Sequence, residues 1–272
     1  MVSRQATAIR MAKHAEALAR TAEKITKSAR KPAPKAKMRV AVLFSGGKDS
    51  TYAVEYCLSK GWEIAYLLSV KPTRTDCYLF HYATVEHTPK QARTLGLRHI
   101  YLSCSVADPV KEANIIKNVV ERNPVDAVVL GGTGLQETQL GSLQNALLPL
   151  GIEVFASHAG MDHDAVMEEM IEKGYDIRIT QFASDGFGKD WLGKRIDADT
   201  LKLLKIRSLQ FGFHVGGEGG YYDTFVCDGP LFKQKLKFNG PRVVMENNYA
   251  GHLVVEDILI QEKQQTGKLL AN

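Results

Sequence analysis

Ser45-Gly46-Gly47-Lys48-Asp49-Ser50 lies between an apolar run, residues 40–44, and a segment of helical character. We expect a strand that ends at Phe44, a short turn, and a helix that begins near Ser50. Paired glycines let the backbone of such a turn approach a ligand closely, and the amide N–H groups and the positive end of the helix dipole face that ligand. The turn therefore predicts an anion-binding site.

The side chains of this turn suit phosphate groups. Lys48 adds a mobile positive charge, Ser45 and Ser50 add hydroxyl donors, and Asp49 could orient the turn or hold a magnesium ion that neutralises phosphate charge. The spacing differs from that of the P-loop in kinases and GTPases, where four residues separate the first glycine from Gly-Lys-Ser/Thr. The alternative is a glycine-rich turn with a solvated lysine.

The six residues resemble the PP-loop of N-type ATP pyrophosphatases, enzymes that cleave ATP to AMP and pyrophosphate. Members of that superfamily adenylate a carboxylate or a carbonyl oxygen and then let a nitrogen or sulfur nucleophile displace AMP. The resemblance implies that residues 45–50 bind ATP.

Composition is that of an ordinary globular protein. The chain has 272 residues, 44% of them hydrophobic, which suffices for one large domain or two modest ones. No apolar run reaches the length of a membrane span, and charged residues stand where a signal peptide would need an apolar stretch. We therefore expect a cytoplasmic protein with no membrane partner. Four widely spaced cysteines form no CxxC pair and indicate buried thiols rather than a zinc site.

The first 37 residues differ from the rest of the chain. Residues 1–39 hold eleven Lys/Arg against two Asp/Glu, whereas the remainder holds 24 basic and 28 acidic residues. Apolar residues recur every three or four positions from Ala8 to Ile25, and a Pro-rich segment, residues 31–35, follows. We predict a basic helical extension and linker over 1–37, which could contact RNA or a second subunit of a homo-oligomer. The alternative is a partly disordered extension that the chemistry does not need.

From Met38 onward, strand-like runs alternate with helical segments. This alternation predicts an α/β fold, a parallel sheet with helices on both faces, over residues 38–150. Ligands of such sheets lie beyond the carboxyl ends of the strands. Gly132 and Thr133 follow a strand that ends at Leu130, so we expect them to bind the same nucleotide as the turn after Phe44. The predicted strands are 39–44, 63–69, 98–103 and 126–130, and the predicted helices are 50–60, 89–95 and 109–122.

A second section, predicted to be a smaller α+β C-terminal domain that binds substrate, spans residues 151–272. We expect its later strands to pair antiparallel. The predicted strands are 152–156, 176–182, 224–227, 234–238, 242–245 and 252–260, and the predicted helices are 164–173 and 198–211.

Two glycine-rich loops of this section are candidate substrate loops. In Gly216-Gly217-Glu218-Gly219-Gly220, flanking glycines allow close approach to a ligand, and Glu218 could position an amine or ammonia, take a proton from it, or bind a metal. The alternative is a mobile turn with a solvated carboxylate. The loop that contains Ser184 and Asp185 could close over substrate, with Lys194 or Arg195 near a phosphate or carboxylate. It could equally be an ordinary turn, with Trp191 as a packing residue.

Histidines give a weaker signal. The spacing of His158, Asp162, His163 and Asp164 matches no usual metal-ligand pattern, and Asp162 stands where a helix cap is expected. We therefore predict a cap and solvated side chains there. His81 follows the second strand at the edge of the glycine turn, where it could touch nucleotide or substrate or make a structural hydrogen bond.

Taken together, these motifs resemble the diphthine–ammonia ligase family. The resemblance covers residues 38 to about 237, and its motifs are residues 45–50, 79–81, Gly132 with Gln139, 168–174, 192–194, 217–220 and 230–232. It implies a PP-loop domain joined to a smaller domain, with the active site between them. The family's activity converts diphthine on translation elongation factor two to diphthamide, using ATP and ammonium.

The resemblance also implies roles for residues. Pyrophosphate would leave under the amides of Gly46 and Gly47 with Lys48 and magnesium, and Glu218 would bind or deprotonate ammonium. Lys48, Asp49 and Glu218 are thus the implied catalytic residues. Together with the loop that contains Ser184 and Asp185, the predicted substrate contacts are His81, Gln139, Ser184, Asp185, Gly217, Gly219, Gly220, Tyr222 and Thr224.

Four positions depart from the family pattern. Tyr221 and Asp223 stand where the family has two glutamates, and Leu140 and Ser142 stand where it has arginines. These changes leave the ATP turn intact and bear on the acceptor, so a paralogue that amidates another carboxylate is one alternative. Thiolation of tRNA is a second, although the chain lacks the cysteine pairs for sulfur delivery. A nucleotide sensor without turnover is a third.

Overall fold

The structure is a computed structural model that describes residues 37–74, 84–132 and 137–263. The described residues from Met38 onward belong to one compact unit. The predicted basic extension therefore lies outside the described residues, except for Lys37. In the described ranges, no helix combines the length and the apolar character needed to cross a membrane.

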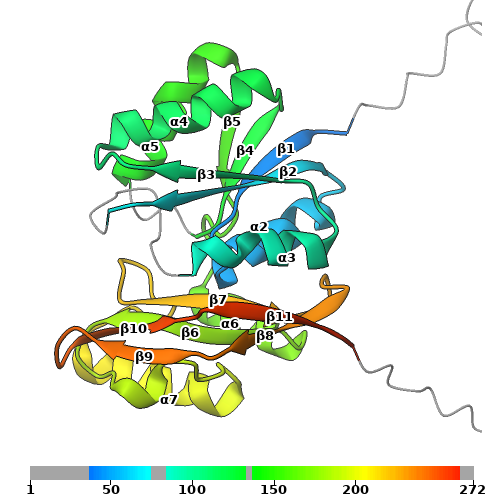
Figure 1. The fold of residues 1–272 in the computed structure, drawn as a ribbon. Helices are drawn as coiled ribbons and strands as arrows, with labels where there is room; N and C mark the ends of the chain where they lie inside the picture. The colour runs from blue at the N-terminus through cyan, green and yellow to red at the C-terminus, as the bar shows by residue number, and fades with distance from the viewer. Residues whose placement is uncertain (1–36, 75–83, 133–136, 264–272) are drawn as a thin grey trace, which may run out of the picture. The chain divides into compact units, whose positions relative to one another are not determined.

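A five-stranded parallel sheet forms the first layer, which confirms the predicted fold class (Figure 1). Its strand order is β3-β2-β1-β4-β5. The chain therefore builds outward from β1 in one direction and then crosses to β4, so a topological switch point lies between β1 and β4. The strands are β1 (Arg39–Leu43), β2 (Glu63–Pro72), β3 (His99–Cys104), β4 (Ala127–Leu130) and β5 (Glu153–Ala156).

The strand predicted at residues 152–156 does not start the second section. It forms β5, which pairs in parallel with β4, Val128 opposite Val154 and Val129 opposite Phe155. The physical reason is that Val154 packs in the same core as β4 and the helices that cover it. The division of residues 38–272 into two domains near residue 150 stays a prediction.

Helices cover both faces of this sheet. Successive side chains of β1 point to opposite faces. Ala41 packs in one core with α4 and α5, whereas Val40 and Val42 pack in a second core with α2, α3 and the C-terminal strands. The helices are α2 (Lys48–Ser59), α3 (Thr88–Leu95), α4 (Pro109–Arg122) and α5 (Glu137–Leu147), and single 3-10 turns are η1 (Val85–His87) and η2 (Leu148–Leu150).

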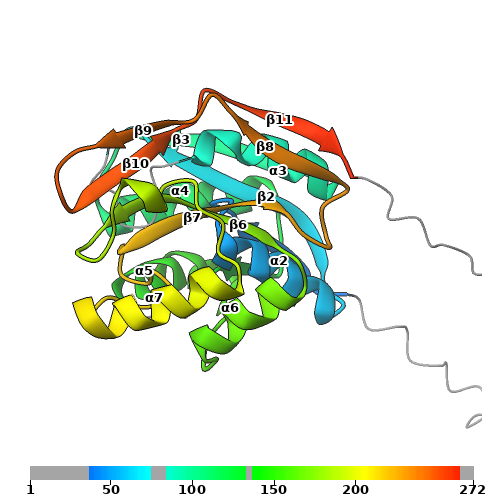
Figure 2. The ribbon, with the colours of Figure 1, turned by 90° about the horizontal axis from the view of Figure 1, so that it is seen from below.

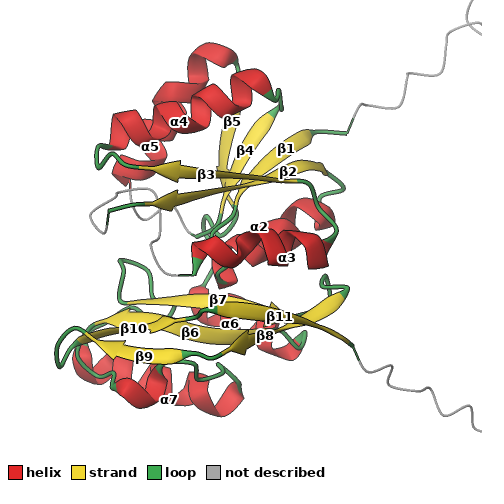
Figure 3. Ribbon diagram, in the orientation of Figure 1, coloured by secondary structure: helices red, strands yellow, loops and turns green. Residues whose placement is uncertain are grey.

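The C-terminal part contains an antiparallel sheet of order β7-β6-β10-β9 and a two-stranded sheet of β11 and β8. In Figure 2, α6 and α7 lie next to each other on one side of these strands, and Figure 3 separates the strands from the helices by colour. The elements are α6 (His163–Glu172), β6 (Asp176–Ala183), η3 (Lys189–Trp191), α7 (Ala198–Phe211), β7 (Tyr222–Asp228), β8 (Gln234–Asn239), β9 (Arg242–Met245), β10 (Ala250–Val254) and β11 (Asp257–Glu262).

The predicted strand 252–260 is wrong as a single strand. It is divided between β10 and β11, which belong to different sheets. The chain changes sheets at Val255, whose side chain is buried and whose carbonyl oxygen lies 2.9 Å from Nε2 of His87. The expected antiparallel pairing of the later strands is confirmed.

The ends of several helices follow the sequence signals. Asp108 caps α4 by accepting a hydrogen bond from the amide of Lys111 at 2.8 Å, and Asp162 caps α6 through the amide of Asp164 at 2.8 Å. The start of α2 differs from the prediction, because the helix begins at Lys48 rather than near Ser50. Lys48 and Asp49 consequently lie in its first turn.

The end of β1 is tied to β2 and β3 by a buried polar chain. Ser69 Oγ donates to the carbonyl oxygen of Phe44 at 2.5 Å, so it accepts a hydrogen bond from Nε2–H of His99 at 2.8 Å. The neutral ring of His99 therefore carries its proton on Nε2. Burial lowers the pKa of His99 to about 4.

This histidine predicts a pH dependence of stability. Because the unfolded chain has a histidine pKa near 6.5, it binds more protons than the folded chain between about pH 6.5 and pH 4, and the free energy of unfolding falls as the pH is lowered through that range. The contribution of His99 is on the order of 2 kcal/mol once its partial exposure is allowed for. Urea unfolding at pH 7, 5.5 and 4.5 should show that the free energy of unfolding falls less in His99→Gln than in the wild type as the pH is lowered. If the free energy of unfolding fell equally with pH in both proteins, the assigned contribution of His99 would be contradicted.

Candidate nucleotide-binding and catalytic site

The glycine turn between β1 and α2 lies at the carboxyl edge of the parallel sheet. Gly46 has a positive φ of 84°, and a Cβ there would come within 2.2 Å of Oε1 of Gln91, so the position requires glycine. The Gly46 amide donates to Ser50 Oγ at 3.1 Å, and the Gly47 amide lies 3.5 Å from Ser45 Oγ. Both predicted serines thus contact the amides that would face a phosphate.

Strand β7 holds this turn from the C-terminal part. Gly47, the N-cap residue of α2, has no side chain to cap the helix, and Oγ1 of Thr224 instead accepts from the amide of Lys48 at 3.0 Å. The amide of Val226 donates to the carbonyl oxygen of Gly46 at 2.9 Å. Buried Gln91 donates from Nε2 to the carbonyl oxygens of Gly46 and Val226, both at 2.8 Å. Sequence reasoning did not find Gln91, which carries no motif.

Thr224→Val tests this anchoring. The variant keeps the shape of the side chain but leaves the Lys48 amide without its acceptor, which should lower the free energy of unfolding by about 1 kcal/mol and weaken ATP binding severalfold. Denaturant unfolding and calorimetric titration with ATP measure the two effects. The matched control is Thr180→Val, because the hydroxyl of Thr180 is buried without a hydrogen-bond partner among the described residues. Equal effects of the two variants would contradict the anchoring role.

Lys48 is a buried cation at the start of α2. Its side chain is 4% exposed, and Nζ lies 2.7 Å from Oδ2 of Asp49 and 5.7 Å from the centre of the Tyr222 ring. Burial by itself would raise the pKa of Asp49, but the charge and the hydrogen bond of the Lys48 ammonium oppose it, and the pKa lies below its ordinary value. Asp49 is therefore a carboxylate at neutral pH.

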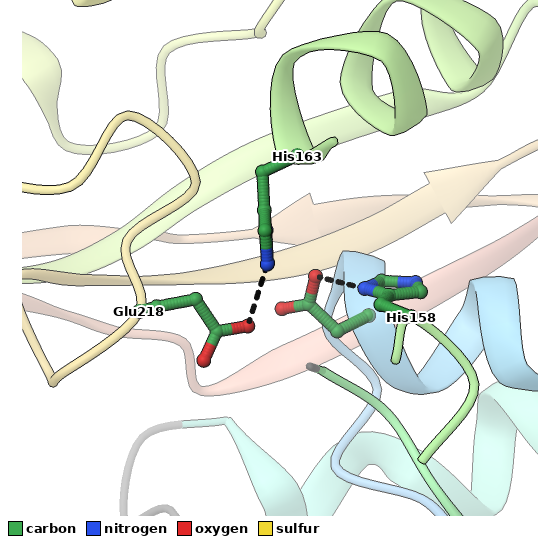
Figure 4. A group of neighbouring side chains, drawn as sticks. His158, His163 and Glu218 are labelled. Carbon is green, nitrogen blue, oxygen red and sulfur yellow. Dashed lines mark ion pairs between the residues drawn. The ribbon is translucent and has the colours of Figure 1, made fainter. Parts of the chain in front are cut away.

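Four side chains from distant parts of the chain meet beside this pair, and we call them the His–carboxylate cluster: Asp49, His158, His163 and Glu218. One donor atom from each lies within 4.8 Å of the others. Nδ1 of His158 is 3.6 Å from Oδ1 of Asp49, and Nε2 of His163 is 3.8 Å from Oε1 of Glu218. In Figure 4, His163 and Glu218 point toward each other from α6 and from the glycine-rich loop before β7.

The prediction that His158 and His163 are solvated is wrong. His158 is fully buried and the side chain of His163 is 9% exposed. The cap at Asp162 was predicted correctly, but it fixes the first turn of α6 so that His163 is aimed inward. Burial lowers the pKa of His158 to about 4 and also lowers the pKa of His163, so both rings are neutral at physiological pH.

Glycines bring the backbone close to this cluster. A Cβ on Gly131 would come within 2.5 Å of the backbone of Asp49 and Ser50, so β4 can approach α2 only with glycine there. Gly132 accepts a hydrogen bond from the amide of His158 at 3.1 Å, and a Cβ on it would lie 3.2 Å from Oε1 of Glu218. The predicted residue Gly132 thus lies at the cluster, at the switch point between β1 and β4.

The other predicted substrate residues are distributed around the glycine-rich loop. Gly217, Gly219 and Gly220 all have positive φ values, and Tyr222 donates from its hydroxyl to the carbonyl oxygen of Val215 at 2.5 Å. The structure does not bring Ser184 and Asp185 into the cluster. They follow the end of β6, where the amide of Ala183 donates a hydrogen bond to the carbonyl oxygen of Tyr221 at 2.9 Å. Thr133, His81 and the side chain of Gln139 lie outside the described residues.

The structure agrees with the interpretation of Trp191 as a packing residue. Trp191 is buried, and Nζ of Lys194 lies 4.9 Å from the centre of its ring. Arg195 lies 3.8 Å from the carboxylate of Asp176. Cys57, Cys104 and Cys227 are free and buried, as expected for those thiols.

The strand order, the switch point and the glycine turn define an α/β protein of the class that binds anionic ligands beyond the carboxyl ends of its strands. Residues 38–143 match the family model described as the diphthamide synthase N-terminal domain, and residues 162–259 match the diphthamide synthase C-terminal domain. The chain belongs to the diphthine–ammonia ligase family, which is a family of ATP-dependent ligases.

Named relatives agree with this assignment. The chain is 30% identical to the diphthine–ammonia ligase of Homo sapiens over 233 residues, and this alignment covers 77% of this chain and 86% of the relative. It is 30% identical over 236 residues to that of Danio rerio, covering 78% and 91%. For the relative in Saccharomyces cerevisiae the identity is 25% over 232 residues, covering 72% of this chain and 34% of the longer relative.

Proposed function

We propose that this protein is a cytoplasmic ligase that adenylates the carboxylate of diphthine on translation elongation factor two and transfers ammonia to it, which yields diphthamide, AMP and pyrophosphate. One observation carries the proposal. A carboxylate oxygen of Glu218, in the glycine-rich loop, lies within 4.8 Å of one of Asp49, in the turn that would hold ATP, so the proposed base would stand beside the proposed nucleotide site. Membership in the diphthine–ammonia ligase family supports the choice of acceptor.

In the first step, a carboxylate oxygen of the acceptor attacks the α-phosphorus of ATP, and the bond from that phosphorus to the bridging oxygen of pyrophosphate breaks. The amides of Gly46 and Gly47 and the ammonium of Lys48 would stabilise the charge that develops on the leaving pyrophosphate. Strand β7 holds the backbone of this turn through the Lys48 amide and the Gly46 carbonyl oxygen. On binding, the Gly46 and Gly47 amides would exchange the hydroxyl oxygens of Ser50 and Ser45 for phosphate oxygens without a change of the turn's position.

In the second step, ammonia attacks the acyl carbon, and AMP leaves with the electrons of the acyl–oxygen bond. A carboxylate is a poor acyl donor until its oxygen becomes part of such a leaving group, which is why ATP is consumed. Glu218 would bind the ammonium ion and accept the proton that must be lost before nitrogen can attack. Gly217, Gly219 and Gly220 would let the backbone come close to the acceptor.

Magnesium is proposed to accompany the triphosphate. Mg²⁺ is usually held by one or two carboxylates together with substrate phosphates, and Asp49, ionised and next to the turn, fits that requirement. When bound, it would neutralise phosphate charge. Asp49 would then orient the phosphate tail relative to Lys48.

The experiment measures pyrophosphate and AMP release by the full-length protein with ATP, with and without ammonium, in the presence and absence of elongation factor two that carries diphthine. Products that require both ammonium and the modified factor support the proposal. Turnover with another carboxylate in place of the factor would identify an acceptor change, consistent with Tyr221 and Asp223. Dependence on tRNA and a sulfur donor, or ATP binding without turnover, would reject the ligase assignment.

A further inference from the structure

Two histidines of the His–carboxylate cluster carry buried nitrogen atoms with unused hydrogen-bonding capacity. Among the described residues, Nδ1 and Nε2 of His158 and Nε2 of His163 have no hydrogen-bond partner. Leaving a buried polar atom unpaired is costly, and such atoms in a folded protein call for a ligand or another explanation. Here the nitrogen atoms face two carboxylates, so the four side chains together form a set of metal donors.

The spacing of the donor atoms is close to that around one metal ion. With bonds of about 2.0–2.2 Å, two ligands of a tetrahedral ion lie about 3.4 Å apart, and opposite ligands of an octahedral ion lie about 4.2 Å apart. The two nitrogen–oxygen pairs are at 3.6 Å and 3.8 Å, and all four donors lie within 4.8 Å. Small side-chain rotations would complete the coordination.

We propose that Asp49, His158, His163 and Glu218 bind one first-row transition-metal dication, with Zn²⁺ as the reference ion. Imidazole nitrogen favours Zn²⁺ and its neighbours, whereas Mg²⁺ prefers an all-oxygen shell and retains its waters. Two carboxylates balance the charge of the dication. The site thus differs in its chemistry from a magnesium ion carried by ATP, which would take oxygen ligands alone.

Surrounding groups hold the donors in place. The amide of His158 is bonded to Gly132, and its ring packs edge-on against Tyr52 with centroids 4.7 Å apart. The ring of His163 packs edge-on against His214, also at 4.7 Å. Oδ2 of Asp49 is occupied by Lys48, which leaves Oδ1 toward His158. Outer contacts of this kind orient metal ligands and raise affinity.

With the metal bound, the cluster and Lys48 together carry net positive charge. That charge would favour an anion beside the cluster. The proposal goes beyond the proposed function, in which Asp49 and Glu218 have other roles, so the metal-bound cluster and the catalytic cluster would be alternative states of the same four side chains. The test of metal binding needs neither ATP nor an acceptor, so the two proposals can fail separately.

The experiment titrates Zn²⁺ into the full-length protein after dialysis against EDTA, in competition with a chromophoric chelator and without nucleotide. We expect one equivalent per chain, with an affinity at least about 100-fold above that for Mg²⁺. Co²⁺ in place of Zn²⁺ should give visible absorption bands from the mixed nitrogen and oxygen shell. ATP binding is measured on the same samples, so loss of ATP binding with Zn²⁺ binding retained would reject only the proposed function.

Variants locate the site. His163→Gln, at the start of α6, should lower Zn²⁺ affinity about 100-fold and abolish the Co²⁺ bands. His158→Asn should do the same, and circular dichroism checks that this fully buried position still permits folding. The matched control is His252→Gln, because His252 forms a histidine–carboxylate pair with Glu246 outside the cluster. Absence of stoichiometric binding, equal affinity for Mg²⁺, or unchanged binding in His163→Gln would overturn the proposal.

Discussion

Lys48→Ala is expected to lower the rate of pyrophosphate release by about 10³-fold while the fold is retained. Lys48 is the buried cation of the glycine turn, and its ammonium would face the charge that develops on the leaving pyrophosphate. Removing one such group from a site with fixed dipoles typically costs about 10²–10³ in rate, and here a full charge is lost. The measurement is single-turnover release of pyrophosphate with saturating acceptor and ATP.

Two further variants separate charge from other effects in this experiment. Lys48→Met keeps most of the buried volume but removes the charge, so it should be as inactive as the alanine variant. Lys60→Ala removes an exposed lysine from the other end of α2 and should leave the rate unchanged. Activity of Lys48→Met above about a tenth of the wild-type rate would show that the charge is not required.

Glu218→Gln is expected to leave ATP affinity within about twofold of the wild type and to lower amide formation about 10²-fold. The variant keeps the size of the side chain but cannot accept a proton, and general-base catalysis typically contributes about 10²–10⁴-fold. Adenylation should still occur, so pyrophosphate would be released in a burst of about one equivalent and then slow. Quenched-flow analysis of pyrophosphate and amide product distinguishes the two steps.

The pH dependence gives a second readout of the same role. Because the fraction of free ammonia rises with pH, the defect of Glu218→Gln should shrink as the pH approaches the pKa of ammonium. Glu121→Gln, which alters an exposed carboxylate on α4, is the control. A defect of equal size at every pH, or a loss of ATP binding, would assign Glu218 to structure rather than to proton transfer.

Local signals predicted most of the fold. The β1 turn, Asp108 before Pro109, and Gly96 after α3 each act within a few residues, and the elements they delimit are present. The class of sheet followed from the alternation of these elements. Membership of β5 could not be predicted in this way, because residues 153–156 read equally well as the last strand of one sheet or the first of another. The break at Val255 likewise depends on contacts with η1, which is far away in the sequence.

The candidate site likewise has one part that could be predicted from local sequence and one part that could not. The turn of residues 45–50 is contiguous, so its chemistry was visible in the sequence. The His–carboxylate cluster was not, because His158 and His163 acquire their meaning only from Asp49, more than a hundred residues earlier, and from Glu218 in another loop. Their spacing to each other matches no metal motif, and their burial is a property of the assembled protein. One signal was available: a predicted helix cap at Asp162 places the next residue in the first turn.

Strand β7 connects the groups that we propose for the two half-reactions, the nucleotide turn and Glu218. Glu218 precedes this strand by a few residues, and Thr224 and Val226 within it are bonded to the turn at Lys48 and Gly46. Strand β7 therefore contacts the turn through two of its residues, and the glycine pair Gly219-Gly220 and Tyr221 join it to the proposed base. The glycine pair would let Glu218 adjust to the acceptor while Thr224 and Val226 keep their hydrogen bonds to the turn, so the grip on the turn and the placement of the base are separable properties of neighbouring residues.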